Sequence, residues 1–122
     1  PTRLYWPFIK DCLNLPGRPV KGLAHITGGG WTNLLRINGN FDYHITDMPS
    51  LSDLPSIFSV VDQRLKIPLV NFLEIFNRGI GMMMVVKPGH NLKEIFSSWN
   101  ETFWFLGHVE KNKTGKGKLI YH

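Results

Sequence analysis

The sequence predicts an α+β fold, with a single mixed sheet of four or five strands and helices packed on it. Segments with apolar residues at helical spacing alternate along the chain with short apolar or alternating segments typical of strands. The 122 residues contain no internal repeat and no linker, which indicates one domain over residues 1–122. Apolar residues make up 43% of the chain, so a core can form without disulfide bonds or structural metals.

The first 50 residues are expected to form a helix, a strand, a short helix and a second strand. Pro7 suits the first turn of a helix, where its missing N–H costs nothing. Residues 20–26 read as a short buried strand, and residues 31–37 can make two helical turns before Asn38-Gly39-Asn40 stops them. Residues 41–45 alternate apolar and polar side chains, as a half-buried strand does. The expected buried face of the first helix is Phe8, Ile9, Cys12 and Leu13.

Two helices are predicted in the middle of the chain. Ser52 or Asp53 can cap the first of them, and Pro55 would lie in its first turn. Pro68 opens the second. Their expected buried stripes are Leu54, Ile57, Phe58, Val61 and Leu65 in the first, and Leu69, Phe72, Leu73 and Phe76 in the second.

The last third is expected to hold a strand, a helix and a pair of strands. Residues 80–86 are apolar apart from Gly81, which predicts a central strand covered on both faces. Asn91 can cap the following helix. Residues 103–109 read as a further strand, beside which residues 118–121 return after a turn. The expected buried side of the helix is Leu92, Ile95, Phe96 and Trp99.

Composition narrows the class of protein. The single Cys12 cannot form an intrachain disulfide, and no Cys/His cluster has zinc-finger spacing. No apolar run approaches the about 18 residues of a membrane span, and the amino terminus lacks a secretory signal, so a cytoplasmic location is expected. Without an initiator Met, the chain reads as a piece of something longer. The net charge of +5 suggests an anionic partner, although the lysines at positions 111–118 read as the solvated end of a hairpin.

Three consecutive glycines form the first candidate site. Thr27 and Gly28-Gly29-Gly30 join a strand to a probable helix start. Such a run is entropically costly and needs a reason, such as positive φ or the close approach of a ligand. A loop of this kind points free N–H groups and the positive end of the helix dipole at one place, which suits phosphate. A tight turn without a ligand is the equal alternative.

The junction at residues 76–81 forms the second candidate site. Gly79 can end a helix in the left-handed conformation. Gly81, inside a strand, indicates the close approach of a ligand or of another backbone. Asn77 and Arg78 would then lie at the sheet edge near the glycine loop. From local chemistry, a structural role for these glycines is favoured over a ligand site.

The remaining chemistry is sparse. His25 lies on a strand between apolar residues, where a histidine is more often a hydrogen-bonded core residue than a catalytic one. Neither glycine junction is a Walker loop or a Rossmann fingerprint, and no carboxylate pair or Ser/His/Asp arrangement is identifiable. The residues alone indicate an anion-binding α+β domain.

Three ordered motifs, spread over nearly the whole chain, resemble the carboxy-terminal half of the aminoimidazole ribonucleotide synthetase family. They are Pro1-Thr2-Arg3-Leu4-Tyr5, Lys21-Gly22-Leu23-Ala24-His25-Ile26-Thr27-Gly28-Gly29-Gly30, and Phe76-Asn77 with Gly79-Ile80-Gly81-Met82. Asn33 and Arg36 are similar to the Asn and Arg that follow the glycines in that family. Glu74 departs from it, because it stands where the family usually has Arg and so inverts a charge near the site.

The resemblance implies an ATP- and Mg²⁺-dependent cyclo-ligase that converts formylglycinamidine ribonucleotide to aminoimidazole ribonucleotide in purine synthesis. This chain would be its carboxy-terminal domain, which binds the phosphorylated ribonucleotide. The amino-terminal ATP-binding domain would be absent, so the chain alone would bind no cofactor tightly and have no ligase activity. Family dimers form mainly through the amino-terminal domains, which leaves a homodimer of this chain open. The implied substrate- and phosphate-binding residues are Thr27, Gly28, Gly29, Gly30, Asn33, Arg36, Asn77, Gly79 and Gly81, with His25 as a catalytic donor or proton carrier.

Three rival interpretations stay open. One is a domain of another ATP-using enzyme of the same superfamily, similar to thiamine-monophosphate kinase or selenophosphate synthetase. Another is a basic nucleic-acid-binding module, disfavoured because most aromatic residues lie on helical stripes that look like core. The third is a non-catalytic domain that retains the fold without the site.

Overall fold

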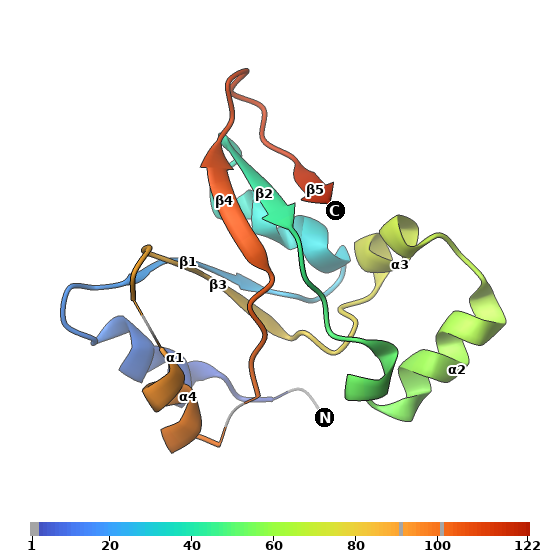
Figure 1. The fold of residues 1–122 in the computed structure, drawn as a ribbon, viewed down its shortest axis with the longest axis horizontal. Coiled ribbons are helices and arrows are strands. Elements are labelled where there is room, and N and C mark those ends of the chain that lie inside the picture. The colour runs from blue at the N-terminus through green and yellow to red at the C-terminus, as the bar shows by residue number, and fades with distance from the viewer. Residues whose placement is uncertain (1–2, 91, 101) are drawn as a thin grey trace.

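The computed structural model describes residues 3–90, 92–100 and 102–122, without the side chains of residues 93–95 (Figure 1). Five strands, four α-helices and two 3₁₀-helices follow one another in these ranges. Their bounds are α1 Trp6–Leu13, β1 Val20–His25, η1 Gly30–Arg36, β2 Phe41–Ile45, η2 Leu51–Asp53, α2 Ser56–Leu65, α3 Leu69–Ile75, β3 Met82–Val86, α4 Lys93–Ser98, β4 Gly107–Lys111 and β5 Leu119–Tyr121. None of these helices combines the length and apolarity that a bilayer crossing requires.

The strands form two sheets, so the predicted α+β class and strand number are confirmed and the predicted single sheet is wrong. β1 pairs with β3 antiparallel, and a separate sheet has the order β4-β2-β5. The strands of the two sheets cross rather than run alongside one another (Figure 1). A layer of side chains separates them, and this layer is where the core lies.

The main core fills the space between the two sheets. Tyr43 and Ile45 of β2 point into it, as their alternation with polar residues predicts. Ala24 of β1 and Met83 of β3 face them from the other sheet. Burial of this apolar layer requires the sheets to stack face to face, which an edge-to-edge single sheet would not allow. The buried members are Ala24, Ile26, Trp31, Leu34, Tyr43, Ile45, Leu73, Ile80 and Met83.

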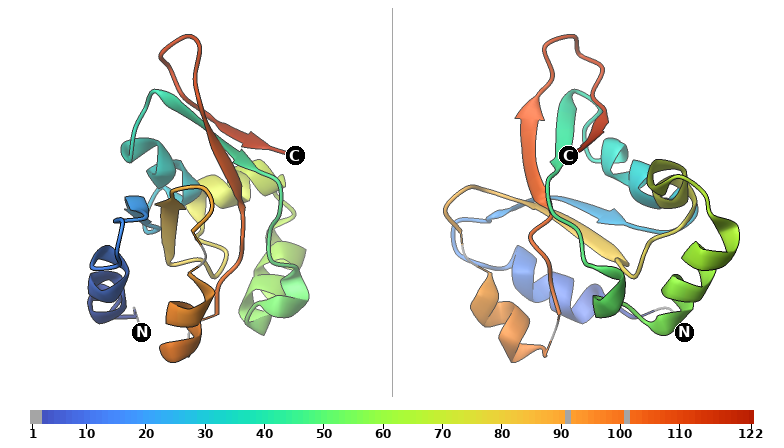
Figure 2. Two further views of the ribbon diagram at one scale, coloured as in Figure 1. Left: turned by 60° about the vertical axis from the view of Figure 1, so that its left-hand side comes forward. Right: turned by 45° about the vertical axis from the view of Figure 1, so that its right-hand side comes forward.

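Helix α1 covers the opposite face of the β1–β3 pair. Phe8, Ile9 and Cys12 are buried there, as predicted, whereas Leu13, also predicted to be buried, is exposed. α4 lies beside α1 (Figure 2), and the rings of Phe8 and Phe96 are 5.0 Å apart. β3 is therefore covered on both faces, as predicted, but it belongs to a two-stranded sheet and is not a central strand. The predicted cap Asn91 lies outside the described residues, as does the side chain of Ile95.

The last strand pairs differently from the prediction. β5 lies parallel to β2, and β2 separates it from β4. The Asp42 carboxylate accepts hydrogen bonds from Asn112 Nδ2 at 2.8 Å and from the Lys118 amide at 3.0 Å. These bonds join β2 to the two ends of the loop between β4 and β5, so the loop passes over the end of β2. β4 begins at Gly107, not at residue 103.

The α2 helix differs most from its prediction. It begins at Ser56, with Pro55 before it and no side-chain cap. Asp53 instead accepts hydrogen bonds from the Ser50 amide and hydroxyl at 2.9 and 2.6 Å, and these bonds lower the pKa of its carboxyl. Leu54 is buried, but Ile57 is 58% exposed and no residue of α2 itself is fully buried. α2 thus lies at the periphery, at the far end from α1 (Figures 1 and 2).

The predicted stripe of α3 is partly confirmed, because Phe72 and Leu73 are buried whereas Leu69 is 40% exposed. Together, α2 and α3 present a patch of exposed apolar side chains, called here the α2–α3 patch. Its members are Ile57, Val60, Leu65, Leu69, Val70 and Ile75.

Candidate functional site

The glycine run forms a tight turn between β1 and η1. The Gly30 amide donates to the Thr27 carbonyl at 3.0 Å, which closes a four-residue turn. Gly29 has φ 88° and ψ 2°, the values of the third residue of a type II turn. The helix that follows is a seven-residue 3₁₀-helix, where two ordinary helical turns were predicted. A strong helix dipole is therefore absent at this position, and the turn itself must supply any anion site.

The three glycines have different reasons to be glycine. Gly29 and Gly30 have positive φ, and a side chain at Gly30 would collide with the Leu73 carbonyl. Gly28 has no positive φ, and nothing lies within 4 Å of the position where its side chain would stand. Packing explains Gly30 and backbone conformation explains Gly29. Gly28 is left with open space beside an exposed backbone.

The carbonyl groups of the turn are all hydrogen-bonded. Asn33 is buried, and its Nδ2 donates to Gly28 O at 3.2 Å and to Gly30 O at 2.7 Å. The Thr32 hydroxyl donates to Gly29 O at 2.5 Å. Within the described residues, the amides of Gly28 and Gly29 donate to no acceptor. The exposed polar backbone of this turn therefore consists of donors, which is the chemistry that an anion requires.

A cleft of about 290 Å³ opens beside the turn. His25, the last residue of β1, lies there with Arg36, the last residue of η1, and both are exposed. The His25 ring makes an edge contact with the Tyr5 ring at 5.8 Å. The core interpretation of His25 is therefore wrong. The residues lining the cleft are Leu23, Ala24, His25, Thr27, Asn33 and Arg36.

The second junction packs against the first without lining this cleft. The Trp31 indole donates to Asn77 O at 3.0 Å, and the Ile26 amide donates to Gly81 O at 2.9 Å. The side-chain oxygen of Asn77 accepts from the Gly79 amide at 3.0 Å. The two predicted segments are thus adjacent. The hydrogen bonds of Asn77, Gly79 and Gly81, however, stabilise the turn at residues 77–80 and its contacts with the first segment, and these three residues do not line the cleft.

Gly79 is not the helix cap that was predicted. α3 ends at Ile75, and Phe76 after it is extended. Gly79 instead follows Arg78 in a turn closed by the Ile80 amide on Asn77 O at 3.0 Å. Both central residues have positive φ, as in a type I′ turn.

Arg78 is a residue that sequence reasoning named without assigning it a role. Its φ of 48° is a conformation that non-glycine residues rarely adopt. Its Nε is buried, and no acceptor in the part of the chain that the structure describes bonds to it. The one sequence signal that could have pointed to Arg78 is the turn in which it lies, because the asparagine and glycine on either side of it favour a tight turn.

Glu74, the charge reversal noted in the sequence, does not line the cleft. It is exposed at the end of α3. Burial raises the pKa of Tyr121, and the negative charge of Glu74 raises it further. The charge of Glu74 is therefore felt by Tyr121 of β5. A larger depression of about 510 Å³ lies between α1 and β1, but it includes none of the predicted site residues.

Comparison with known proteins gives a consistent match. The family model for AIR synthase related protein, C-terminal domain, matches residues 3–120. The phosphoribosylformylglycinamidine cyclo-ligase of Syntrophus aciditrophicus is 35% identical over 125 residues, covering 99% of this chain and 35% of that protein. The protein of the same name from Brevibacillus brevis is 34% identical, covering all of this chain and 34% of its own length. That of Methanobrevibacter smithii is 42% identical over 66 residues, or 54% of this chain and 18% of the relative. The chain thus spans about a third of the length of the relatives that it matches throughout.

Proposed function

Because this chain belongs to the family of AIR synthase related proteins, as their C-terminal domain, we propose that it is the substrate-binding part of a cyclo-ligase. The intact enzyme converts formylglycinamidine ribonucleotide and ATP to aminoimidazole ribonucleotide in purine synthesis, in the cytoplasm. The names of the curated relatives support this reaction over those of related ATP-using enzymes.

One observation carries the proposal for this chain: the two free amides of the glycine turn. The free N–H groups of Gly28 and Gly29 directly follow Thr27, which lines the same cleft as Arg36. Hydrogen bonds from such donors to a phosphate oxygen are charge-assisted, and Arg adds a planar fork that fits phosphate. The substrate is a ribonucleotide, so its phosphate is the group that this corner of the cleft binds.

The other cleft residues have supporting roles. Thr27 is exposed at the entrance to the turn and orients the substrate through its hydroxyl. Asn33 holds the turn in place from inside, with its Nδ2 on two carbonyls. His25 lies at the end of β1 in the same cleft and carries a proton to or from the reacting amide. Asn77, Gly79 and Gly81 support the glycine turn from behind, where Asn77 O accepts from Trp31.

In the proposed reaction, ATP phosphorylates the formamide oxygen, and the amidine nitrogen then closes the ring as that phosphate leaves. This chemistry requires positioning and neutralisation of charge more than a strong base. The residues of the cleft do not fit a magnesium ion, because none of them is a carboxylate. We therefore assign ATP and Mg²⁺ to the part of the protein outside this chain.

The α2–α3 patch is the surface on which that remaining part docks. Six of the large apolar side chains that are exposed in the described residues lie on α2 and α3, and concentrated apolar exposure is a feature of interfaces. Two thirds of each full-length relative lies outside the matched segment, which provides an occupant. Residues 1–122 are accordingly a carboxy-terminal domain that is completed by an amino-terminal ATP-binding domain, and the chain alone has no turnover.

The test uses the intact enzyme and one matched pair of variants. Arg36→Gln should lower kcat/KM by about 10- to 100-fold, the equivalent of one lost charge-assisted hydrogen bond. Arg18→Gln, which removes an exposed arginine at the Pro16–Pro19 turn, should leave it unchanged. The measurement is ADP release that depends on formylglycinamidine ribonucleotide. Equal kcat/KM values for the two variants would refute the proposed phosphate site. Absence of substrate-dependent ADP release would refute the proposed reaction.

A further inference from the structure

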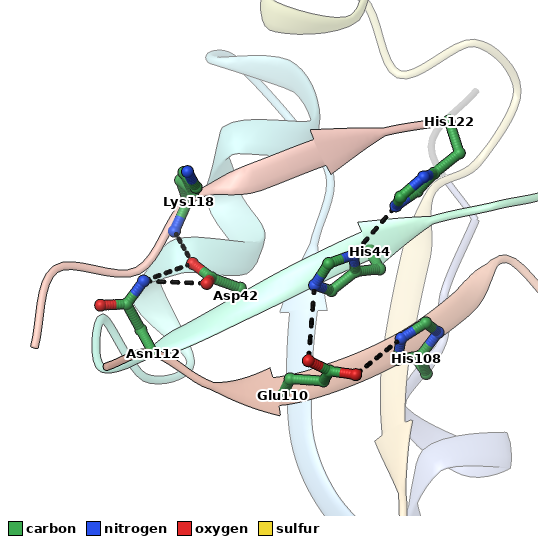
Figure 3. A network of polar contacts seen from close by, with 7 residues as sticks. All are labelled: Asp42, His44, His108, Glu110, Asn112, Lys118 and His122. Carbon is green, nitrogen blue, oxygen red and sulfur yellow. Dashed lines mark hydrogen bonds and ion pairs between the residues drawn. The ribbon is translucent and has the colours of Figure 1, made fainter. Parts of the chain in front are cut away.

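Three side chains that can bind metal gather on the outer face of the β4-β2-β5 sheet (Figure 3). His44 of β2 lies directly opposite His108 of β4, and Glu110 follows two residues later on the same face. Their neighbours Tyr43 and Val109 point to the other side, toward the core between the sheets. The strand alternation therefore places all three polar side chains on one surface, away from the phosphate cleft on β1 and η1.

The ligand atoms of the three residues are already close. One nitrogen or oxygen of each lies within 4.8 Å of the others. His108 Nε2 is 3.3 Å from Glu110 Oε1, and His44 Nε2 is 4.0 Å from Glu110 Oε2. Ligands bound tetrahedrally at about 2.0–2.1 Å from a zinc ion lie about 3.3 Å apart. Small side-chain rotations are sufficient to reach that separation.

Exposure shows which ligands can move. The His44 side chain is 17% exposed, whereas those of His108 and Glu110 are 52% and 64% exposed. The His44 ring also stacks on the His108 ring, with the centroids 4.8 Å apart and the planes 3° from parallel. His44 is thus the fixed ligand on the central strand, and the other two have the freedom to close on an ion.

A second contact fixes the orientation of His44. Its Nδ1 lies 2.9 Å from His122 Nε2, and the His122 amide donates to Ile45 O at 3.0 Å, which holds His122 beside β2. When Nδ1–H donates to His122, the lone pair of His44 is on Nε2, the nitrogen that faces Glu110. Ligating histidines in metal sites characteristically make such a bond through the nitrogen that does not bind the metal.

We propose that His44, His108 and Glu110 bind one divalent transition-metal ion of the Zn²⁺ class, with His122 as the positioning residue. Two imidazoles and one carboxylate suit Zn²⁺, Ni²⁺ or Cu²⁺ and not Mg²⁺ or Ca²⁺, which prefer oxygen ligands. Water completes the coordination on the solvent side. Asp42, on the same face, is not a ligand because Asn112 and Lys118 occupy its oxygens.

The experiment is a calorimetric titration of the chain with ZnCl₂, repeated with CoCl₂ to record the visible absorption of the bound Co²⁺. One ion per chain is expected, released by a chelator. His108→Gln and Glu110→Gln should each weaken binding by at least about tenfold, and His122→Gln by a smaller factor. His90→Gln removes an exposed histidine outside the sheet and should change nothing. The four variants must keep the circular dichroism of the parent chain.

Two results would overturn the proposal. Binding that is equally strong in His108→Gln and in the parent chain would show that the ion attaches elsewhere. No binding by the folded parent chain would show that the cluster is only a histidine–glutamate contact network. Neither result bears on the phosphate cleft, which lies on other elements.

Discussion

The contrast between Gly28 and Gly30 gives the sharpest test of the glycine turn. Gly30→Ala places a methyl group against the Leu73 carbonyl and forces a non-glycine residue to φ 54°. The left-handed conformation alone costs about 1–2 kcal/mol, and displacement of a packed backbone adds a similar amount. Gly28→Ala meets open space at an ordinary φ, so its effect on the free energy of unfolding should stay within about 0.5 kcal/mol.

The assay is urea and thermal unfolding of the two variants and the parent chain. Gly30→Ala should lower the free energy of unfolding by about 2–4 kcal/mol, which is a fall in Tm on the order of 10 °C for a chain of this size. Gly28→Ala should have the same unfolding midpoints as the parent chain. It should nevertheless lose phosphate binding, because its methyl group stands beside the free amides. Equal destabilisation by both substitutions would refute the separate roles assigned to these glycines, and unchanged phosphate binding by Gly28→Ala would refute the site.

Four further outcomes are expected. Asn33→Ala leaves the Gly28 and Gly30 carbonyls without their buried donor, so it should destabilise the chain by about 1–3 kcal/mol in denaturant titrations. Burial, followed by the nearby Asp11 charge, raises the pKa of the Cys12 thiol to about 11 from 9.0, so at about pH 8 the native chain should react with a thiol reagent roughly 100-fold more slowly than the unfolded chain. Because this pKa is raised in the folded state, the free energy of unfolding should be constant below pH 9 and should fall as the pH rises toward about 11. Denaturant unfolding measured across that pH range would show the fall. Ile57→Gln, on the α2–α3 patch, should change stability by less than about 0.5 kcal/mol but weaken binding of the separately produced amino-terminal domain, as measured by calorimetry.

Local patterns predicted the elements well. The helix after Pro7, the strand at residues 41–45 and the apolar strand before Lys87 were found where spacing and turn residues indicated them. These features depend on neighbours in the sequence, and the periods of helix and strand are visible in a short window.

The larger failures concern contacts between distant segments. Pairing of β5 with β2 joins residues 119–121 to residues 43–45, and nothing in either segment specifies that partner over β4. The stripe on α2 was read correctly as apolar, but a stripe does not show whether its partner lies within the chain, and here Ile57 and Leu65 stay exposed. The division into two sheets has the same origin, since only the filled core between them distinguishes stacking from edge pairing.

The two candidate sites differ in how far sequence could reveal them. The residues of the glycine turn are contiguous in the chain, so their order alone suggests a phosphate loop as one of two equal interpretations. The cluster of His44, His108 and Glu110 comes from two strands more than sixty residues apart, and it exists only through the register of β2 on β4. The hydrogen bonds of Asn33 to two carbonyls of the turn could not be read from the sequence either, because they depend on how the turn folds back on η1.

At the proposed phosphate site, the strength of binding by this chain alone follows from the donors that remain. The Gly30 amide is used within the turn, and the 3₁₀-helix is short, so among the described residues the turn offers two free amides beside the exposed Arg36. Hydrogen bonds to a charged group contribute about 1.5–3 kcal/mol each, and the loss of translational freedom on binding offsets much of their sum. A net of about 4 kcal/mol corresponds to a Kd near 1 mM. Tighter binding of the ribonucleotide must come from contacts outside this cleft, and the amino-terminal domain proposed to complete the enzyme is where we expect them.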